Sequence, residues 1–129
     1  MVNEVLFNSV IYFILPVSIL EFFFFFNYHS LLNILVTITS LLNHGYSNKK
    51  YIILDRCMVY FISIVNIYIC PEINLYLSFF SLLLYTLSKI SINYKYKNFF
   101  HCILHIIGSC SNIVIMIKIN KRQFNYVKV

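Results

Sequence analysis

The chain has 129 residues, of which 60% are hydrophobic and 11% charged, and its mean hydropathy is +0.80. A soluble globular domain carries charge on about 25% of its residues, so this composition excludes that class and indicates an integral, multi-pass membrane protein. The net charge of +6 does not indicate binding to nucleic acid, because the basic residues lie at the ends of apolar segments and form no stripe or arm. We expect a single transmembrane helical domain over residues 1–129.

The apolar segments predict about five transmembrane helices. A bilayer core about 30 Å thick needs roughly 20 apolar residues in helical form. Residues 5–42 are too long for one crossing, and the polar cluster at 27–30 suits a turn between two crossings. The expected spans are residues 5–26, 30–43, 51–70, 73–91 and 99–119. These spans must be helices because every backbone group in lipid needs an internal hydrogen-bond partner.

Polar and helix-breaking residues separate the predicted spans. Residues 44–50 form a polar loop, Pro71 starts a tight turn, residues 93–98 look like an interfacial loop and residues 120–129 form a basic tail. Lysines occur on both sides of the expected bundle, so they do not decide its orientation. Glu21, inside the first span, needs a partner or an interfacial position, and His29 is interpreted as interfacial.

Small residues are scarce in this chain. Alanine is absent and glycine occurs twice, so we expect serine to supply the close helix contacts that membrane proteins build from small side chains. The four cysteines form no CxxC pair and lie in or beside apolar segments, so we expect no disulfide.

Five polar residues stand out in so apolar a chain, namely Ser40, His44, Asp55, His101 and His105. His101 and His105 are four residues apart, which places them on one helix face about 6 Å apart along the axis. Ser40 and His44 have the same spacing. The end of the second span and the starts of the third and fifth lie on one side of the membrane, so all five residues are expected at similar depth.

Three neutral imidazoles with an open fourth position are a catalytic zinc arrangement, which makes bound water a nucleophile near neutral pH. We therefore expect His44, His101 and His105 to converge on one zinc ion. Asp55 would act as general base on the water or orient a ligand histidine. Ser40 would hydrogen-bond the water or a developing oxyanion. A site at this depth suits a lipid whose amide or ester bond lies at headgroup level.

Each of these residues also has an ordinary interpretation. An HxxxH pair in an apolar helix can arise by chance, and histidines near loops can simply be solvated. Asp55 could form a local ion pair with Arg56, and Ser40 could serve only helix packing. On this alternative the chain is a small structural or interaction membrane protein without catalytic activity.

The string Ser40-Leu-Leu-Asn-His44, then Asp55, then His101-Cys-Ile-Leu-His105 resembles the CREST superfamily of membrane hydrolases, with spacing most similar to the alkaline ceramidases. The resemblance implies that the three histidines are zinc ligands, that Asp55 is the water-orienting base and that Ser40 stabilises the transition state. It implies zinc-dependent hydrolysis of a lipid amide or ester, with a ceramide-like lipid or a phospholipid as substrate.

The chain departs from this family in its number of helices. The family has seven, and between its aspartate and its terminal HxxxH it has three spans where this chain has room for one. Both numbers are odd, so the HxxxH helix still starts on the same side as Asp55. The resemblance therefore implies a reduced form of the seven-helix hydrolase fold.

Overall fold

The computed structural model describes residues 3–25, 27–46 and 48–127, and for residues 123–127 it describes the backbone alone. Over these residues the chain is an all-α bundle without strands. The predicted fold class is confirmed.

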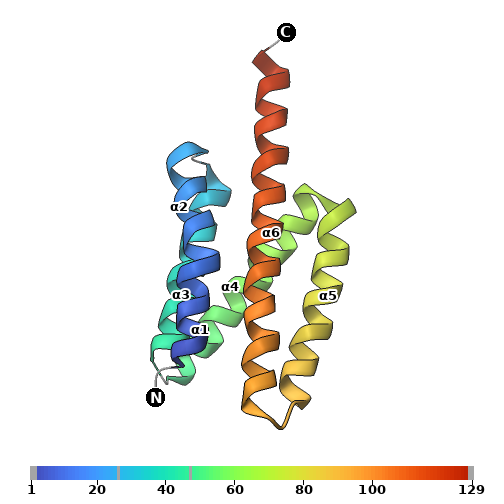
Figure 1. Cartoon of the computed structure of the whole chain (residues 1–129). Helices are drawn as coiled ribbons and strands as arrows, with labels where there is room; N and C mark the ends of the chain where they lie inside the picture. The colour runs from blue at the N-terminus through green and yellow to red at the C-terminus, as the bar shows by residue number, and fades with distance from the viewer. Residues whose placement is uncertain (1–2, 26, 47, 128–129) are drawn as a thin grey trace.

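Five helical rods make up the bundle (Figure 1). The N-terminal rod, Glu4–Phe24, consists of α1 (Glu4–Ser9), a π-helical turn η1 (Val10–Ile14) and α2 (Leu15–Phe24). The others are α3 (Tyr28–Gly45), α4 (Lys49–Ile69), α5 (Pro71–Ile90) and α6 (Tyr94–Val127). The N-terminal rod, α4, α5 and α6 are long and apolar enough to span a membrane. The shorter α3 is not among these four, because its 18 residues include several polar side chains.

Local sequence explains most of the helix ends. Asn27 caps α3, since its side chain accepts from the Ser30 backbone N–H while Ser30 Oγ accepts from the Asn27 N–H. Asn48 caps α4 in a similar way by accepting from the Lys50 N–H at 3.0 Å. Pro71 occupies the first turn of α5, where its missing N–H costs no hydrogen bond.

The predicted interfacial loop 93–98 is wrong, and α6 is longer at both ends than the predicted span 99–119. It begins at Tyr94, inside the predicted 93–98 loop, and the Asn93 side chain accepts from the Lys95 N–H at 2.9 Å. At the other end the helix continues through Val127, and the predicted tail 120–129 is therefore helical over its described part. Residues 120–127 contain neither proline nor glycine, and their lysine, arginine and glutamine are good helix formers.

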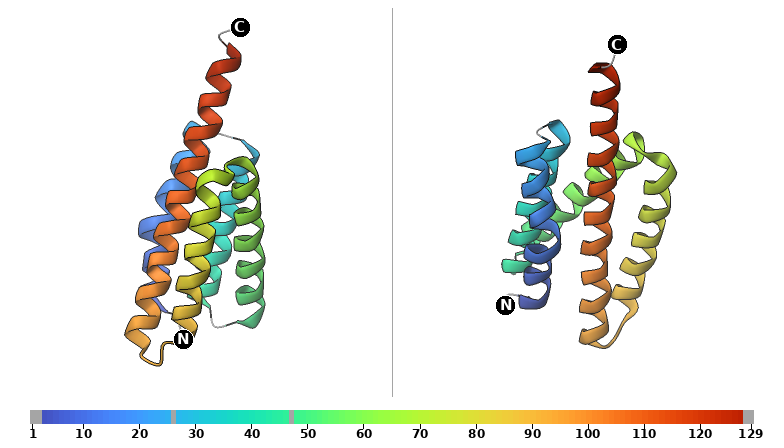
Figure 2. Two further views of the ribbon diagram at one scale, coloured as in Figure 1. Left: turned by 90° about the vertical axis from the view of Figure 1, so that its right-hand side faces the viewer. Right: turned by 45° about the horizontal axis from the view of Figure 1, so that its top comes forward.

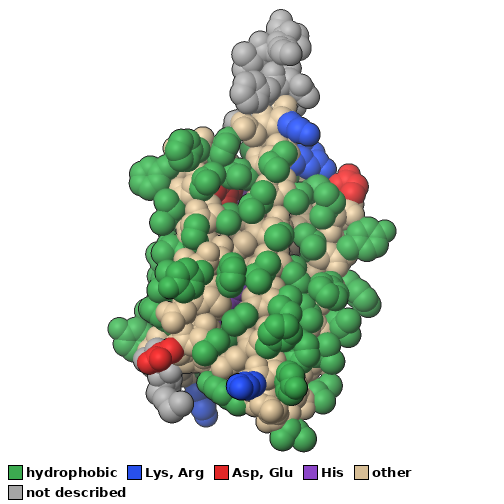
Figure 3. All heavy atoms as spheres, viewed as in Figure 1, with side chains coloured by type: hydrophobic (Ala, Val, Ile, Leu, Met, Phe, Trp, Pro, Cys, Tyr) green, Lys and Arg blue, Asp and Glu red, His purple; other side chains and the backbone are tan. Residues whose placement is uncertain are grey.

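The helices are arranged around α6. It contacts the N-terminal rod, α4 and α5, while α3 packs between the N-terminal rod and α4. The C-terminal turns of α6 extend past the other helices (Figures 1 and 2). Hydrophobic side chains cover most of the face in Figure 3, and the charged ones at its surface gather toward the two ends. This distribution fits a multi-pass membrane protein.

A closed ring of polar side chains fills the interior near the α2–α3 turn. His29 Nδ1 lies 2.5 Å from Glu21 Oε1 and His29 Nε2 lies 2.7 Å from Asn66 Oδ1. Asn66 donates to Asn112 at 3.0 Å, Asn112 to Asn33 at 2.7 Å, and Asn33 to Glu21 Oε2 at 2.8 Å. The expected partner of Glu21 is therefore present. His29, interpreted as interfacial, lies beside the α2–α3 turn, and its side chain is buried against that carboxylate.

Candidate metal centre

Three histidines converge at the other end of the bundle, where α3 ends and α6 begins. One potential ligand atom from each of His44, His101 and His105 lies within 4.8 Å of the others. The ring centroids are 5.0 Å apart for His44 and His101, 5.3 Å for His44 and His105, and 5.0 Å for His101 and His105. The predicted convergence is confirmed, and the cluster could hold a metal ion. Nitrogens bound tetrahedrally at about 2.0–2.1 Å lie about 3.4 Å apart, so the ligand atoms would move closer together to hold one ion.

Local structure explains how these three rings meet. His101 and His105 lie on one face of α6 because they are four residues apart. His44 occupies the last turn of α3, where its carbonyl accepts from the Asn3 N–H at 3.1 Å. A Cβ on the adjacent Gly45 would lie 3.3 Å from the Phe7 ring, so glycine permits the N-terminal rod to approach the end of α3 closely.

His44 carries the one side-chain polar atom that is buried and unpaired among the described residues. Its Nε2 has no hydrogen-bond partner, although leaving a buried polar group unsatisfied costs about 1–3 kcal/mol. A metal ion accepts the lone pair of a neutral imidazole and would remove this penalty. The donor set therefore fits a metal ion.

His105 is held by a residue that the sequence analysis missed. Its Nδ1 lies 2.6 Å from Ser9 Oγ, on the N-terminal rod, and both side chains are buried. Ser9 and His105 are 96 positions apart in sequence. No motif connects them, and only their packing brings them together.

Asp55 is buried in α4 with hydrogen-bond donors on both carboxylate oxygens. Ser40 Oγ donates to Oδ1 at 2.5 Å and Asn43 Nδ2 donates to Oδ2 at 2.6 Å. The carboxylate also interacts electrostatically with His44. Asn43 is a second residue that the sequence analysis missed, although it lies inside the SxxxH string. The sequence did offer a signal for Asn43. It lies three residues after Ser40, and residues three apart share a helix face.

This geometry bears on the ordinary interpretations of Asp55 and Ser40. The carboxylate is paired with Ser40 and Asn43, and Arg56 forms no ion pair among the described residues. The single hydroxyl proton of Ser40 is directed to Asp55. A hydrogen bond from Ser40 to a water or an oxyanion needs another hydroxyl rotamer and stays a prediction.

Three cationic side chains act electrostatically on His101. They are Arg56, Lys89 and Lys97, and all three are exposed. An anionic group that approached the histidines from the side of these three residues would meet a favourable potential.

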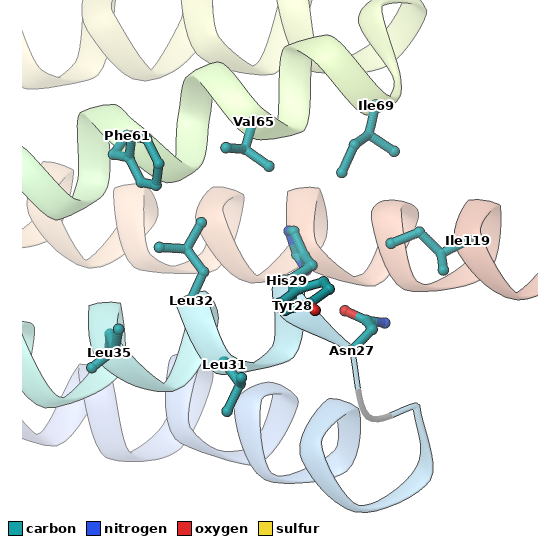
Figure 4. Close-up of a pocket in the computed structure, with 10 residues that line it drawn as sticks. All are labelled: Asn27, Tyr28, His29, Leu31, Leu32, Leu35, Phe61, Val65, Ile69 and Ile119. Carbon is teal, nitrogen blue, oxygen red and sulfur yellow. The ribbon is translucent and has the colours of Figure 1, made fainter.

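An apolar cavity lies elsewhere in the bundle. It is a groove of about 560 Å³ between α3 and α4, lined mainly by apolar side chains such as Leu31, Leu35, Phe61 and Val65 (Figure 4). It includes none of the five candidate residues and lies toward the N-terminal end of α3, away from His44. The histidine cluster is therefore not part of this groove.

Comparisons with protein-family models, curated proteins and solved structures give no match to this chain. The case for a function depends on the geometry of the cluster and its neighbours.

Proposed function

We propose that the chain is a zinc-dependent membrane hydrolase that cleaves a lipid amide or ester bond near the membrane interface. The convergence of His44, His101 and His105 supports this proposal most directly. Three imidazoles with room for a water are a donor set typical of catalytic zinc. The order and spacing of the same residues resemble those of the alkaline ceramidases, which is why we favour hydrolysis over a purely structural ion.

In this proposal each protein group has a separate role. The three imidazoles hold the ion, and a zinc ion bound there would polarise a water and the substrate carbonyl. Asp55 takes the proton of the attacking water and returns it to the leaving amine or alcohol. Ser40 and Asn43 orient this carboxylate by donating to its two oxygens, in the way that outer-sphere partners orient catalytic groups.

The surroundings of the cluster narrow the choice of substrates to test. The cationic side chains near His101 favour a lipid whose headgroup carries phosphate, whereas the resemblance favours a ceramide-like lipid. Both classes therefore belong in the panel, with amide and ester bonds represented in each.

The test measures metal content and hydrolysis on purified protein in detergent. We expect wild-type protein to bind one zinc ion per chain. His101→Ala and His105→Ala should lose it, since each removes one ligand of three. Asp55→Asn should keep the zinc and lower hydrolysis by about 10²-fold or more, because the base is lost and the ligands are not.

His29→Gln is the control for loss of a buried histidine outside the cluster. Because it also leaves Glu21 without its histidine partner, zinc content is measured per folded protein. This variant should retain zinc. Wild-type protein that binds no zinc would refute the proposal and leave the structural or interaction protein as the surviving account. Zinc binding without hydrolysis across the panel would leave the ion as a structural clamp.

A further inference from the structure

Ser9 Oγ makes two short polar contacts, and its hydroxyl has only one proton to donate. Its Oγ lies 2.7 Å from the Leu6 carbonyl oxygen and 2.6 Å from His105 Nδ1. Ser9 is 4% exposed and His105 is 7% exposed, so water does not compete for either contact. The position of the proton therefore decides the tautomer of His105.

The two contacts can be satisfied together in only one way. A carbonyl oxygen accepts and cannot donate, so the serine proton must point to Leu6 O. Ser9 Oγ then offers a lone pair to His105, which has to donate from a protonated Nδ1. In the opposite arrangement the proton points to His105, and two oxygens face each other at 2.7 Å without a proton between them, which is repulsive.

A neutral imidazole with its proton on Nδ1 has its lone pair on Nε2. We infer that Ser9 is a positioning residue of the metal centre, which holds His105 in the tautomer whose Nε2 can bind the ion. This inference rests on the proposed function, because it assigns a role at the same cluster. It extends the centre to the N-terminal rod, which supplies no ligand of its own.

A second contact fixes the register between the N-terminal rod and α6. Ser109 Oγ lies 2.7 Å from the Phe13 carbonyl oxygen and 2.9 Å from the His105 carbonyl oxygen, and its one proton is directed to either of them. Phe13 is four residues after Ser9, and Ser109 is four residues after His105, so the two contacts lie one turn apart along both helices. Phe13 belongs to the π-helical turn η1, a distortion that often occurs at functional sites.

The test compares three variants that all change a buried serine hydroxyl on the N-terminal rod. Ser9→Ala removes the acceptor for His105, and Ser9→Thr keeps it. Ser18→Ala is the matched control, because Ser18 is buried on the same rod and its Oγ contacts the Ile14 carbonyl and Thr37 Oγ. Both serines make contacts on the rod and to a neighbouring helix, and of the two Ser9 alone contacts a histidine.

Zinc affinity is the first readout. We expect Ser9→Ala to weaken it 10- to 100-fold, the range typical of removing an outer partner of a ligand histidine. Ser9→Thr should bind zinc with an affinity within about threefold of wild type, because it keeps the hydroxyl that accepts from His105. Ser18→Ala should bind zinc as wild type does, even if it unfolds more easily.

The second readout is the tautomer itself, from nitrogen NMR of protein labelled at the histidine side chains and prepared without metal. Wild-type His105 should carry its proton on Nδ1, and Ser9→Ala should shift protonation toward Nε2. A wild-type His105 protonated on Nε2 would overturn the inference without any variant. If wild-type protein binds zinc and Ser9→Ala binds it equally well, the inference fails alone. If wild-type protein binds no zinc, the proposed function fails and the inference fails with it.

Discussion

Buried polar groups in this bundle are paired almost throughout the described residues, and the exception lies in the cluster of three histidines. Both oxygens of Glu21 and both oxygens of Asp55 accept hydrogen bonds. His44 Nε2 is buried and accepts none. A buried polar atom without a partner destabilises the fold, and the metal ion of the proposed function would supply a partner for this nitrogen.

Asn43 provides a test at the residue level that does not depend on activity. Asn43→Leu has nearly the same size and removes the donor to Asp55 Oδ2, so we expect it to lower the free energy of unfolding by about 1–3 kcal/mol. In a double-mutant cycle with Asp55→Leu the two effects should be strongly non-additive, because the two side chains contact each other. The measurement is reversible unfolding in mixed micelles.

The control for Asn43→Leu is Asn8→Leu, the same replacement at an exposed position of the N-terminal rod. It should change stability little. Additive effects of Asn43→Leu and Asp55→Leu would show that the hydrogen bond between these two side chains does not contribute significantly to stability.

Asparagine and histidine make many of the contacts between helices that serine was expected to provide. Serine does connect helices, as in the 2.6 Å contact between Ser18 Oγ and Thr37 Oγ. The ring that contains Glu21 and His29 additionally joins α2, α3, α4 and α6. Ser111 extends it to α5 by donating to Asn74 at 2.5 Å. Inter-helix hydrogen bonds of this kind stabilise membrane bundles, where lipid weakens the hydrophobic driving force.

Removing one member of the buried Glu21–His29 pair should destabilise the fold far more than removing both. Glu21→Leu leaves His29 Nδ1 and Asn33 Nδ2 without an acceptor, and we expect the free energy of unfolding to fall by about 3–5 kcal/mol. Glu21→Leu combined with His29→Leu removes the buried charges together and should recover part of that loss. Unfolding in mixed micelles measures both variants.

Glu72→Gln is the control for charge alone. Glu72 pairs with Lys118 at 3.1 Å on the surface, and exposed ion pairs contribute little to stability. The account of the ring would be contradicted if Glu21→Leu were as stable as Glu72→Gln.

At the scale of the whole molecule, the helices differ in length relative to a bilayer. With about 1.5 Å of rise per residue, α3 is about 27 Å long, slightly shorter than a hydrocarbon core of about 30 Å. By the same measure α6, with 34 residues, is much longer than the core. Whether α3 crosses completely decides which side of the membrane each connection faces.

Cysteine labelling with a membrane-impermeant reagent distinguishes five crossings from four. The four native cysteines are free, so a variant without them is the background. Single cysteines are then placed at four exposed positions, namely Tyr28, Lys50, Glu72 and Ile92. With five crossings, positions 50 and 92 react from one side and positions 28 and 72 from the other. Reaction of positions 28, 50 and 92 from the same side would mean that α3 does not cross.

The sequence by itself determined the membrane class, the five helices and the three histidines that converge. These properties depend on composition, on segment length, on four-residue spacing within a helix and on the alternation of span ends between the two sides of the membrane. The helix ends were less predictable at α6, because polar residues at 94–98 and 120–127 suit both a loop and a helix that extends beyond the membrane.

Only the tertiary structure decided the partners of the polar side chains. Ser9 contacts His105 across 96 positions and Asn33 contacts Asn112 across 79, and neither separation leaves a periodic signal in the sequence. His29 looked interfacial because it follows a turn, yet the fold directs it inward to Glu21. The physical reason is that a hydrogen bond depends on ångström-scale placement of two atoms, which is set by how whole helices pack and not by the pattern along either one.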